Sequence, residues 1–254
     1  MRIFSRSQAS PGAGTRLRVL CFAHAGAGAA MFRTWPEVLP EGVELACPTL
    51  PGREARAAER PLSDMQAVVA AVIEQVLPLP DVPYCLFGHS LGAFIAFDLA
   101  HELARRGAPL PRHLFVAAQR SPRLAHPQPT IYQLPDAAFL EGVHLRHDAL
   151  PAALLADDAM KRFLIRLLRA DFTLVEAYRC CAGAPLACAV TVFGGRDDTA
   201  VPSALLDGWA DETSGACEIV LVPGGHFFFK SHPREFFPAF SARLATAMHS
   251  AQPH

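Results

Sequence analysis

Residues 88–92 read Gly-His-Ser-Leu-Gly, a G-x-S-x-G pattern with Ser90 at its centre. Four apolar residues, 84–87, precede the pattern, and an amphipathic stretch over residues 93–106 follows it. A strand, a sharp turn and a helix form the setting in which such a serine serves as a nucleophile. The flanking glycines permit the strained turn. A serine hydroxyl is a weak nucleophile by itself, so the chain must also supply a base and a group that orients the base.

Two later segments offer those groups. The apolar run at residues 190–193 leads to Asp197 and Asp198, and the run at residues 219–222 leads to His226. Each polar residue follows the end of a predicted strand, which is the edge where open α/β sheets build their sites. Ser, Asp, His is also the chain order of an α/β-hydrolase triad. We therefore predict Ser90 as nucleophile, His226 as base and an aspartate as the group that orients it.

Spacing favours Asp198 over Asp197 as the third member. Asp198 lies three residues after Gly195 and three before Val201, which is the spacing usual for the acid loop of these hydrolases. Asp197 is then expected to brace the turn. Taken singly, an Asp-Asp pair is more often a turn or a helix cap, and a histidine after two glycines is more often a loop residue. The three motifs together, in this order, favour the catalytic interpretation.

An early strand at residues 17–22 ends in a run of small residues, 23–29. Small side chains let the backbone approach a substrate carbonyl, so we predict an oxyanion hole formed by the backbone N–H groups of Ala25 and Leu91. Losing one such donor typically costs about 3 kcal/mol of transition-state stabilisation. The loop lacks both G-x-x-x-x-G-K-[ST] and G-x-G-x-x-G, which disfavours a phosphate-binding loop. His24 is expected to anchor the loop.

Alternating strand-like and helix-like segments predict an α/β-hydrolase fold, with a mostly parallel central sheet and helices on both faces. We expect a flexible leader over residues 1–15 and a single domain over residues 16–250, with an insertion at about residues 125–182 that forms a helical lid. Apolar residues of that lid either line an acyl channel or only dock the lid onto the body. They are Leu140, Leu154, Leu155, Phe163, Leu167, Phe172 and Leu174.

Composition excludes several classes of function. The 254 residues carry a net charge of −1, so nothing global suggests a nucleic-acid partner. No apolar run approaches the roughly 20 residues that a membrane span needs, and no signal peptide is evident, so a cytoplasmic location is expected. The seven cysteines give neither a C-x-x-C pair nor a zinc pattern. Neither a metal nor an organic cofactor is expected, and a monomer is the default.

The chain resembles the type II thioesterases, the stand-alone editing hydrolases of polyketide and nonribosomal peptide assembly lines. The resemblance extends from about Leu17 to about Leu244. It rests on residues 21–26, 50–53, 87–93, 118–122, 169–179 and 224–228. The Pro-Gly-Arg at residues 51–53 and the Arg-Ala-Asp-Phe at residues 169–172 are not general α/β-hydrolase features and carry most of the family specificity. Departures at Ala27, residues 119–122 and Thr199 concern loop shape and substrate range.

This resemblance implies thioester hydrolysis, with the acyl group carried on the phosphopantetheine arm of an acyl or peptidyl carrier protein. Carrier proteins are usually acidic, and basic residues near the mouth of the site would steer them. The arginines considered are Arg53, Arg56, Arg60, Arg120 and Arg123. A solvated loop of paired arginines and glutamates, with Glu54 and Glu59, is the alternative for these residues.

Three other functions remain open on the sequence. A general esterase or acyl-CoA thioesterase would share the triad and differ in its lid and docking surface. A thioesterase domain that ends a synthase would release product, although the chain has only a short leader and no carrier module. A non-catalytic ligand-binding protein that kept the hydrolase fold has no need for Ser90, Asp198 and His226 together.

Overall fold

The computed structural model describes residues 14–78, 82–147, 157–180 and 183–249. Its centre is a six-stranded parallel sheet with the strand order β2-β1-β3-β4-β5-β6. The strands are β1 (Leu17–Phe22), β2 (Val43–Ala46), β3 (Tyr84–His89), β4 (His113–Ala117), β5 (Ala189–Gly195) and β6 (Cys217–Val222). Strands β1, β3 and β4 are almost entirely buried, as expected for a parallel sheet covered on both faces.

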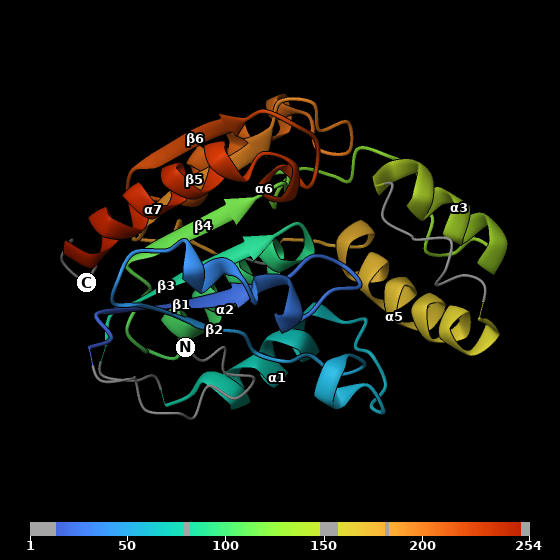
Figure 1. Cartoon of the computed structure of the whole chain (residues 1–254). Helices are drawn as coiled ribbons and strands as arrows, with labels where there is room; N and C mark the ends of the chain where they lie inside the picture. Colours follow the sequence, from blue (N-terminus) through green and yellow to red (C-terminus); the bar gives the residue numbers. More distant parts are fainter. Residues whose placement is uncertain (1–13, 79–81, 148–156, 181–182, 250–254) are drawn as a thin grey trace.

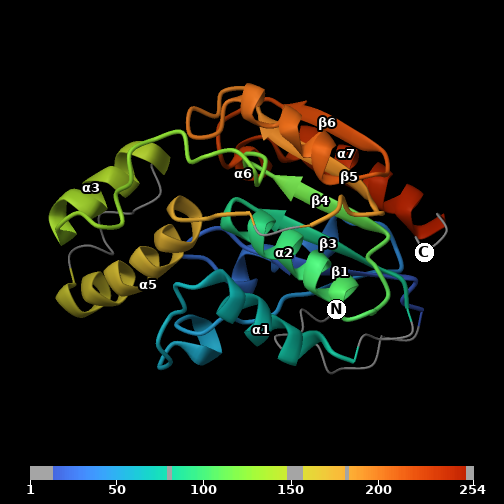
Figure 2. The same cartoon turned by 180° about the vertical axis from the view of Figure 1, so that it is seen from behind.

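Helices cover both faces of the sheet, which confirms the predicted α/β-hydrolase fold. Helices α1 (Met65–Val76) and α2 (Leu91–Arg105) lie on one face, and α6 (Phe228–Ser231) and α7 (Pro233–His249) lie on the other (Figures 1 and 2). Two hydrophobic clusters correspond to these faces. On the α7 face, the rings of Trp35, Phe87, Phe236 and Phe240 meet mostly edge to face. Such aromatic pairs pack the layer beyond what buried area alone supplies.

Helices α3 (Asp136–His147) and α5 (Asp158–Glu176) lie in the connection between β4 and β5. Figure 1 shows both helices beyond the carboxyl ends of the strands, where the predicted site should lie. Phe139 and Val143 of α3 pack with Leu168 and Phe172 of α5, and Ile131, which precedes α3, completes this cluster. Helix α5 begins after Asp157, whose side chain accepts the Met160 N–H at 2.6 Å. Leu154 and Leu155, and most of the expected leader, fall outside the described residues.

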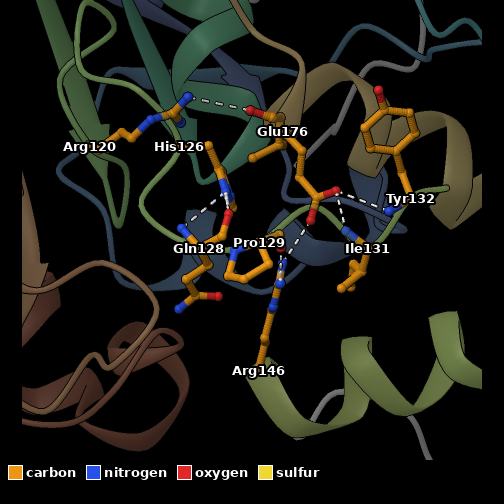
Figure 3. Close-up of polar contacts among 9 residues, drawn as sticks. Arg120, His126, Gln128, Pro129, Ile131, Tyr132, Arg146 and Glu176 are labelled. Carbon is orange, nitrogen blue, oxygen red and sulfur yellow. Dashed lines mark hydrogen bonds and ion pairs between the residues drawn. The ribbon is translucent and has the colours of Figure 1, made fainter. Parts of the chain in front are cut away.

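A buried glutamate fastens the connection between β4 and β5 to the end of α5. The side chain of Glu176 accepts the backbone N–H groups of Ile131 and Tyr132 at 2.8 and 3.0 Å, and it pairs with Arg146 of α3 at 2.7 Å (Figure 3). The Arg146 guanidinium also donates to the Pro129 carbonyl. These contacts link α3, the end of α5 and residues 129–132 to one another.

Short 3-10 helices complete the described part of the chain. They are η1 (Ala29–Phe32), η2 (Trp35–Glu37), η3 (Glu54–Arg56), η4 (Ser203–Leu205) and η5 (Asp207–Glu212). Of the helices that the structure describes, none combines the length and apolar character needed to cross a membrane.

Candidate active site

Ser90 occupies a strained turn between β3 and α2. Its backbone has φ 54° and ψ −117°, a conformation that residues with a side chain rarely adopt, and its N–H donates to the Ala117 carbonyl at 2.8 Å. The flanking glycines have no room for a side chain. A Cβ at Gly88 would lie 2.1 Å from the Gly92 carbonyl oxygen, and one at Gly92 would lie 2.1 Å from the Phe22 carbonyl oxygen. The turn can therefore form only where both positions are glycine.

His226 and Asp198 come together from the loops after β6 and β5. The imidazole Nδ1 lies 2.9 Å from Asp198 Oδ2, and both side chains are buried. The other oxygen, Oδ1, accepts the backbone N–H groups of Ala200 and Val201 at 2.9 and 3.0 Å. With both of its oxygens engaged, the carboxylate is fixed in position. It accepts a hydrogen bond from the Nδ1–H group, which sets the tautomer of His226.

Asp197 has a different environment from its neighbour. It is exposed, its carboxylate accepts the Gly224 N–H at 3.1 Å, and its own N–H donates to the Gly224 carbonyl at 3.0 Å. These contacts tie the loop after β5 to the loop after β6. The structure thus places Asp198 against His226 and leaves Asp197 to brace the two loops.

His89 has a structural role that the sequence motif did not reveal. Its side chain is fully buried and its Nε2 donates to the His226 carbonyl at 2.8 Å. Burial lowers the pKa of His89 well below its ordinary value, so the ring is neutral. The ring also packs on Phe229 at a centroid distance of 4.9 Å. The G-x-S-x-G pattern leaves this position open, so no signal within the motif predicts that it fixes the backbone of His226.

The loop after β1 reaches the same site. His24 is neutral because burial lowers its pKa to about 4, and its Nδ1 donates to the Ala25 carbonyl at 2.9 Å. Ala25 lines the cavity that contains Ser90 and His226. Leu91 follows Ser90 as the first residue of α2, where backbone N–H groups have no partner within the helix and the helix dipole favours negative charge. Of the two predicted oxyanion donors, Ala25 therefore shares the cavity with Ser90, and Leu91 follows it directly at the start of α2.

Ser90, Ala25 and His226 open into a cavity of about 190 Å³. Helix α5 contributes four residues to its apolar wall and α3 contributes one. The apolar residues from these helices are Val143, Leu164, Leu168, Phe172 and Val175, and polar lining comes from Gln119, Arg120, His126, Gln128 and Arg146.

Phe172 lines this cavity, as the sequence predicted. The described residues Leu140, Phe163, Leu167 and Leu174 do not line it, so a role in the acyl channel is supported for Phe172 alone among the described candidates. Positions 164, 168, 172 and 175 share one face of the helix at spacings of four, four and three. Leu174 instead packs into the hydrophobic cluster on the face of the sheet that α1 and α2 cover.

The arginines considered for steering a carrier protein do not form one basic surface. Arg53 and Arg120 are buried, with exposed fractions of 6% and 1%, so neither can steer a partner. Arg56 pairs with Glu59 at 2.6 Å, and Arg123 pairs with Glu212 at 3.0 Å. For Arg56, the alternative of a loop with paired charges is correct. Within the described residues, no group of three or more His, Cys, Asp and Glu side chains could hold a metal ion.

Comparison with known proteins places this geometry in a family. The model of the thioesterase domain family matches residues 17–244. The gramicidin S biosynthesis protein GrsT of Aneurinibacillus migulanus is 34% identical over 220 residues, which cover 87% of this chain and 86% of that protein. Thioesterase PikA5 of Streptomyces venezuelae is 32% identical over 235 residues, which cover 92% of this chain and 83% of that protein.

A solved structure agrees with these matches. The RedJ thioesterase from the prodiginine pathway of Streptomyces coelicolor superposes with a TM-score of 0.81 and is 33% identical, covering 97% of this chain and 91% of that one.

Proposed function

The chain belongs to the thioesterase domain family, and from this premise we propose that it is a type II thioesterase of a polyketide or nonribosomal peptide pathway. It removes acyl groups from the phosphopantetheine arms of acyl or peptidyl carrier proteins. The observation that carries the proposal is that Ser90 and His226 line one cavity, with Asp198 bonded to His226 and α5 supplying apolar residues to the wall. The names of its relatives, which refer to gramicidin S and prodiginine biosynthesis, support the choice of pathway class.

The reaction follows from the roles proposed for these residues. His226 takes the proton of Ser90 as its oxygen attacks the thioester carbonyl, and Asp198 stabilises the imidazolium that forms. The backbone N–H groups of Ala25 and Leu91 bind the oxyanion of the tetrahedral intermediate. Collapse of the intermediate expels the thiol, which takes the proton from His226. Water, activated by His226, then hydrolyses the acyl-enzyme.

The connection from about residue 125 to residue 182 is the lid of this site. Its helix α5 walls the cavity with Leu164, Leu168, Phe172 and Val175, and these side chains would contact the acyl chain. An apolar wall favours the alkyl part of a substrate because burying each methylene contributes about 0.8 kcal/mol. The polar side chains of the same cavity suit the oxygen and amide groups of an acyl chain or of the pantetheine arm.

A general esterase or acyl-CoA thioesterase would use the same three residues. The rate on a carrier-bound substrate, relative to the rate on free substrates, therefore distinguishes these functions from the proposed one. The test presents one short acyl group on a phosphopantetheinylated carrier protein, on coenzyme A and on a small free thioester. The proposal predicts a much higher kcat/KM on the carrier protein, with no turnover by the Ser90→Ala control on any of the three. Equal kcat/KM on all three would identify a general acyl hydrolase. A wild-type protein that binds acyl compounds without turning them over would identify a ligand-binding homologue.

A further inference from the structure

A buried ion pair joins helix α5 to the loop after β1. The Asp171 carboxylate, which is fully buried on α5, accepts the Gly26 backbone N–H and Arg53 Nη2, each at 2.7 Å. Arg53 Nη1 also donates to the Ala27 carbonyl at 2.9 Å. The two sequence motifs with most family specificity, Pro-Gly-Arg and Arg-Ala-Asp-Phe, therefore meet at residues 26 and 27. The reaction steps themselves use neither motif.

The contacts fix the peptide next to the proposed oxyanion donor. The carbonyl of the Ala25–Gly26 peptide accepts from His24 Nδ1 at 2.9 Å, and its N–H donates to Asp171. Because both polar groups of this peptide are held, the plane of the peptide cannot rotate. The direction of the preceding N–H, which belongs to Ala25, is constrained with it.

Helix α5 also packs closely against the loop after β1. Gly26 has φ +78°, and a Cβ there would lie 2.7 Å from Leu168 Cδ2. Leu168 and Phe172, on either side of Asp171 along α5, line the cavity. A movement of α5 that widened the cavity would therefore also draw Asp171 away from the Gly26 N–H.

Charge explains why an arginine accompanies the aspartate. An unpaired carboxylate this close to the site would repel the negative charge that develops on the substrate oxygen. Arg53 neutralises Asp171 through a hydrogen bond within the buried pair and holds the Ala27 carbonyl with its other nitrogen. A lysine could not make both contacts in the same geometry, because it has a single ammonium nitrogen, whereas the planar guanidinium presents two terminal nitrogens.

We propose that Asp171 and Arg53 are positioning residues that complete the oxyanion hole only while α5 is seated on the loop after β1. This inference rests on the proposed function, because it takes Ala25 as an oxyanion donor. The helix that forms the wall for the acyl chain thus also sets the catalytic loop. Substrate entry and assembly of the oxyanion hole are coupled through one side chain.

The test compares two stable analogues of the same acyl thioester. A trifluoromethyl ketone adds to Ser90 and forms a tetrahedral oxyanion, whereas the amide analogue keeps a planar carbonyl. Asp171→Asn is expected to weaken inhibition by the ketone by about 10- to 100-fold and to lower kcat by a similar factor, somewhat less than loss of an oxyanion donor. The Kd of the amide analogue is expected to change little.

Glu176→Gln is the matched control. Glu176 is also buried on α5 and also pairs with an arginine, but its partners are Arg146 and the backbone of residues 131–132 (Figure 3). This variant is expected to lower thermal stability while leaving the ratio of ketone to amide affinity unchanged. Arg53→Lys should reproduce the selective loss seen in Asp171→Asn, and it serves alone if Asp171→Asn does not fold.

If Asp171→Asn or Arg53→Lys weakened the binding of both analogues equally, the inference would be overturned. The ion pair of Asp171 and Arg53 would then have only a structural role. An unchanged ketone affinity would overturn it as well. Failure of the proposed function is distinguishable because it shows in the wild-type protein. A wild type that prefers free esters loses the carrier-protein assignment but still permits the comparison, and a wild type that hydrolyses neither esters nor thioesters overturns both proposals.

Discussion

At the residue scale, two adjacent carboxylates do different work. Asp198 is buried and accepts from His226 Nδ1 and two backbone N–H groups, whereas Asp197 is exposed and bridges to Gly224. Asp198→Asn is expected to lower kcat on the order of 10³- to 10⁴-fold, because the amide can stabilise the wrong imidazole tautomer. Asp197→Asn is the control and should lower it only slightly. Steady-state kcat values of the two variants on one substrate provide the test. A larger loss in Asp197→Asn than in Asp198→Asn would contradict the assignment of Asp198 as the partner of His226.

The glycines around Ser90 make a second prediction at this scale. Gly92→Ala places a methyl group against the Phe22 carbonyl oxygen. The clash is with backbone, so a change of side-chain rotamer cannot relieve it. The variant should lose about 3 kcal/mol or more of unfolding free energy. Gly183→Ala, where a Cβ meets nothing within 4 Å, should stay within about 0.5 kcal/mol of the wild type. Urea denaturation measures both, and similar stabilities would argue against the tight turn.

What the sequence reveals at this scale depends on the kind of residue. Ser90 and His226 follow from motifs because chemistry requires those side chains at strand ends. Asp171 lies 145 positions from Gly26, and nothing in the local sequence indicates that a helical aspartate reaches a loop so far away. Arg53 was considered as a surface residue because a polar, charged segment predicts exposure. Its burial depends on a partner that only the tertiary structure supplies.

At the scale of elements, the part of the cavity wall that α5 supplies is expected to select acyl groups by length. Leu164→Trp fills part of the cavity wall and should lower kcat/KM for a long acyl chain by about 10- to 100-fold while sparing acetyl, since pocket size discriminates by roughly this factor per methylene or two. Phe163→Trp changes the preceding residue, which does not line the cavity, and is the control. A chain-length series on one carrier protein provides the measurement. Parallel losses for long and short chains would show that the wall does not select length.

Strands β1, β3, β5 and β6 and helix α2 could be predicted because their apolar patterns are continuous, whereas α1 and α7 were not predicted. Strand β2 was not predicted, since it has only four residues and two of them are only partly buried at the edge of the sheet. The sequence also left open which apolar residues of α5 line the cavity, and of those considered and described only Phe172 does. The apolar side of that amphipathic helix is broad and contains both cavity-lining residues and residues that pack into the core, so hydrophobic pattern alone does not tell them apart.

At the scale of the whole molecule, buried histidines should make stability depend on pH. Burial lowers the pKa of His24 and His113 to about 4 and that of His89 well below its ordinary value. The unfolded chain, with imidazole pKa values near 6.5, takes up these protons first as the pH falls. Stability is therefore lost between about pH 6.5 and pH 4. Asp98 acts in the opposite sense, because burial raises its pKa to about 6.

Burial also lowers the pKa of His101 and His126 and raises that of Glu212. Five histidines therefore oppose two carboxyl groups, and the unfolding free energy should decline from pH 7 to pH 4.5. Urea denaturation at several pH values measures the decline. His113→Gln lies outside the cavity and should flatten it without affecting turnover, because His113 contacts Thr191 rather than the site. A stability that stays level from pH 7 to pH 4.5 would show that these rings titrate normally.

In the proposed reaction Ser90 carries the acyl group between carrier protein and water. Intact-protein mass spectrometry after mixing with an acylated carrier protein would detect this intermediate. A transient acyl adduct is expected on Ser90 of the wild-type protein and not in Ser90→Ala, with hydrolysis lost in parallel. Continued hydrolysis of the carrier-bound thioester by folded Ser90→Ala would rule out Ser90 as the nucleophile.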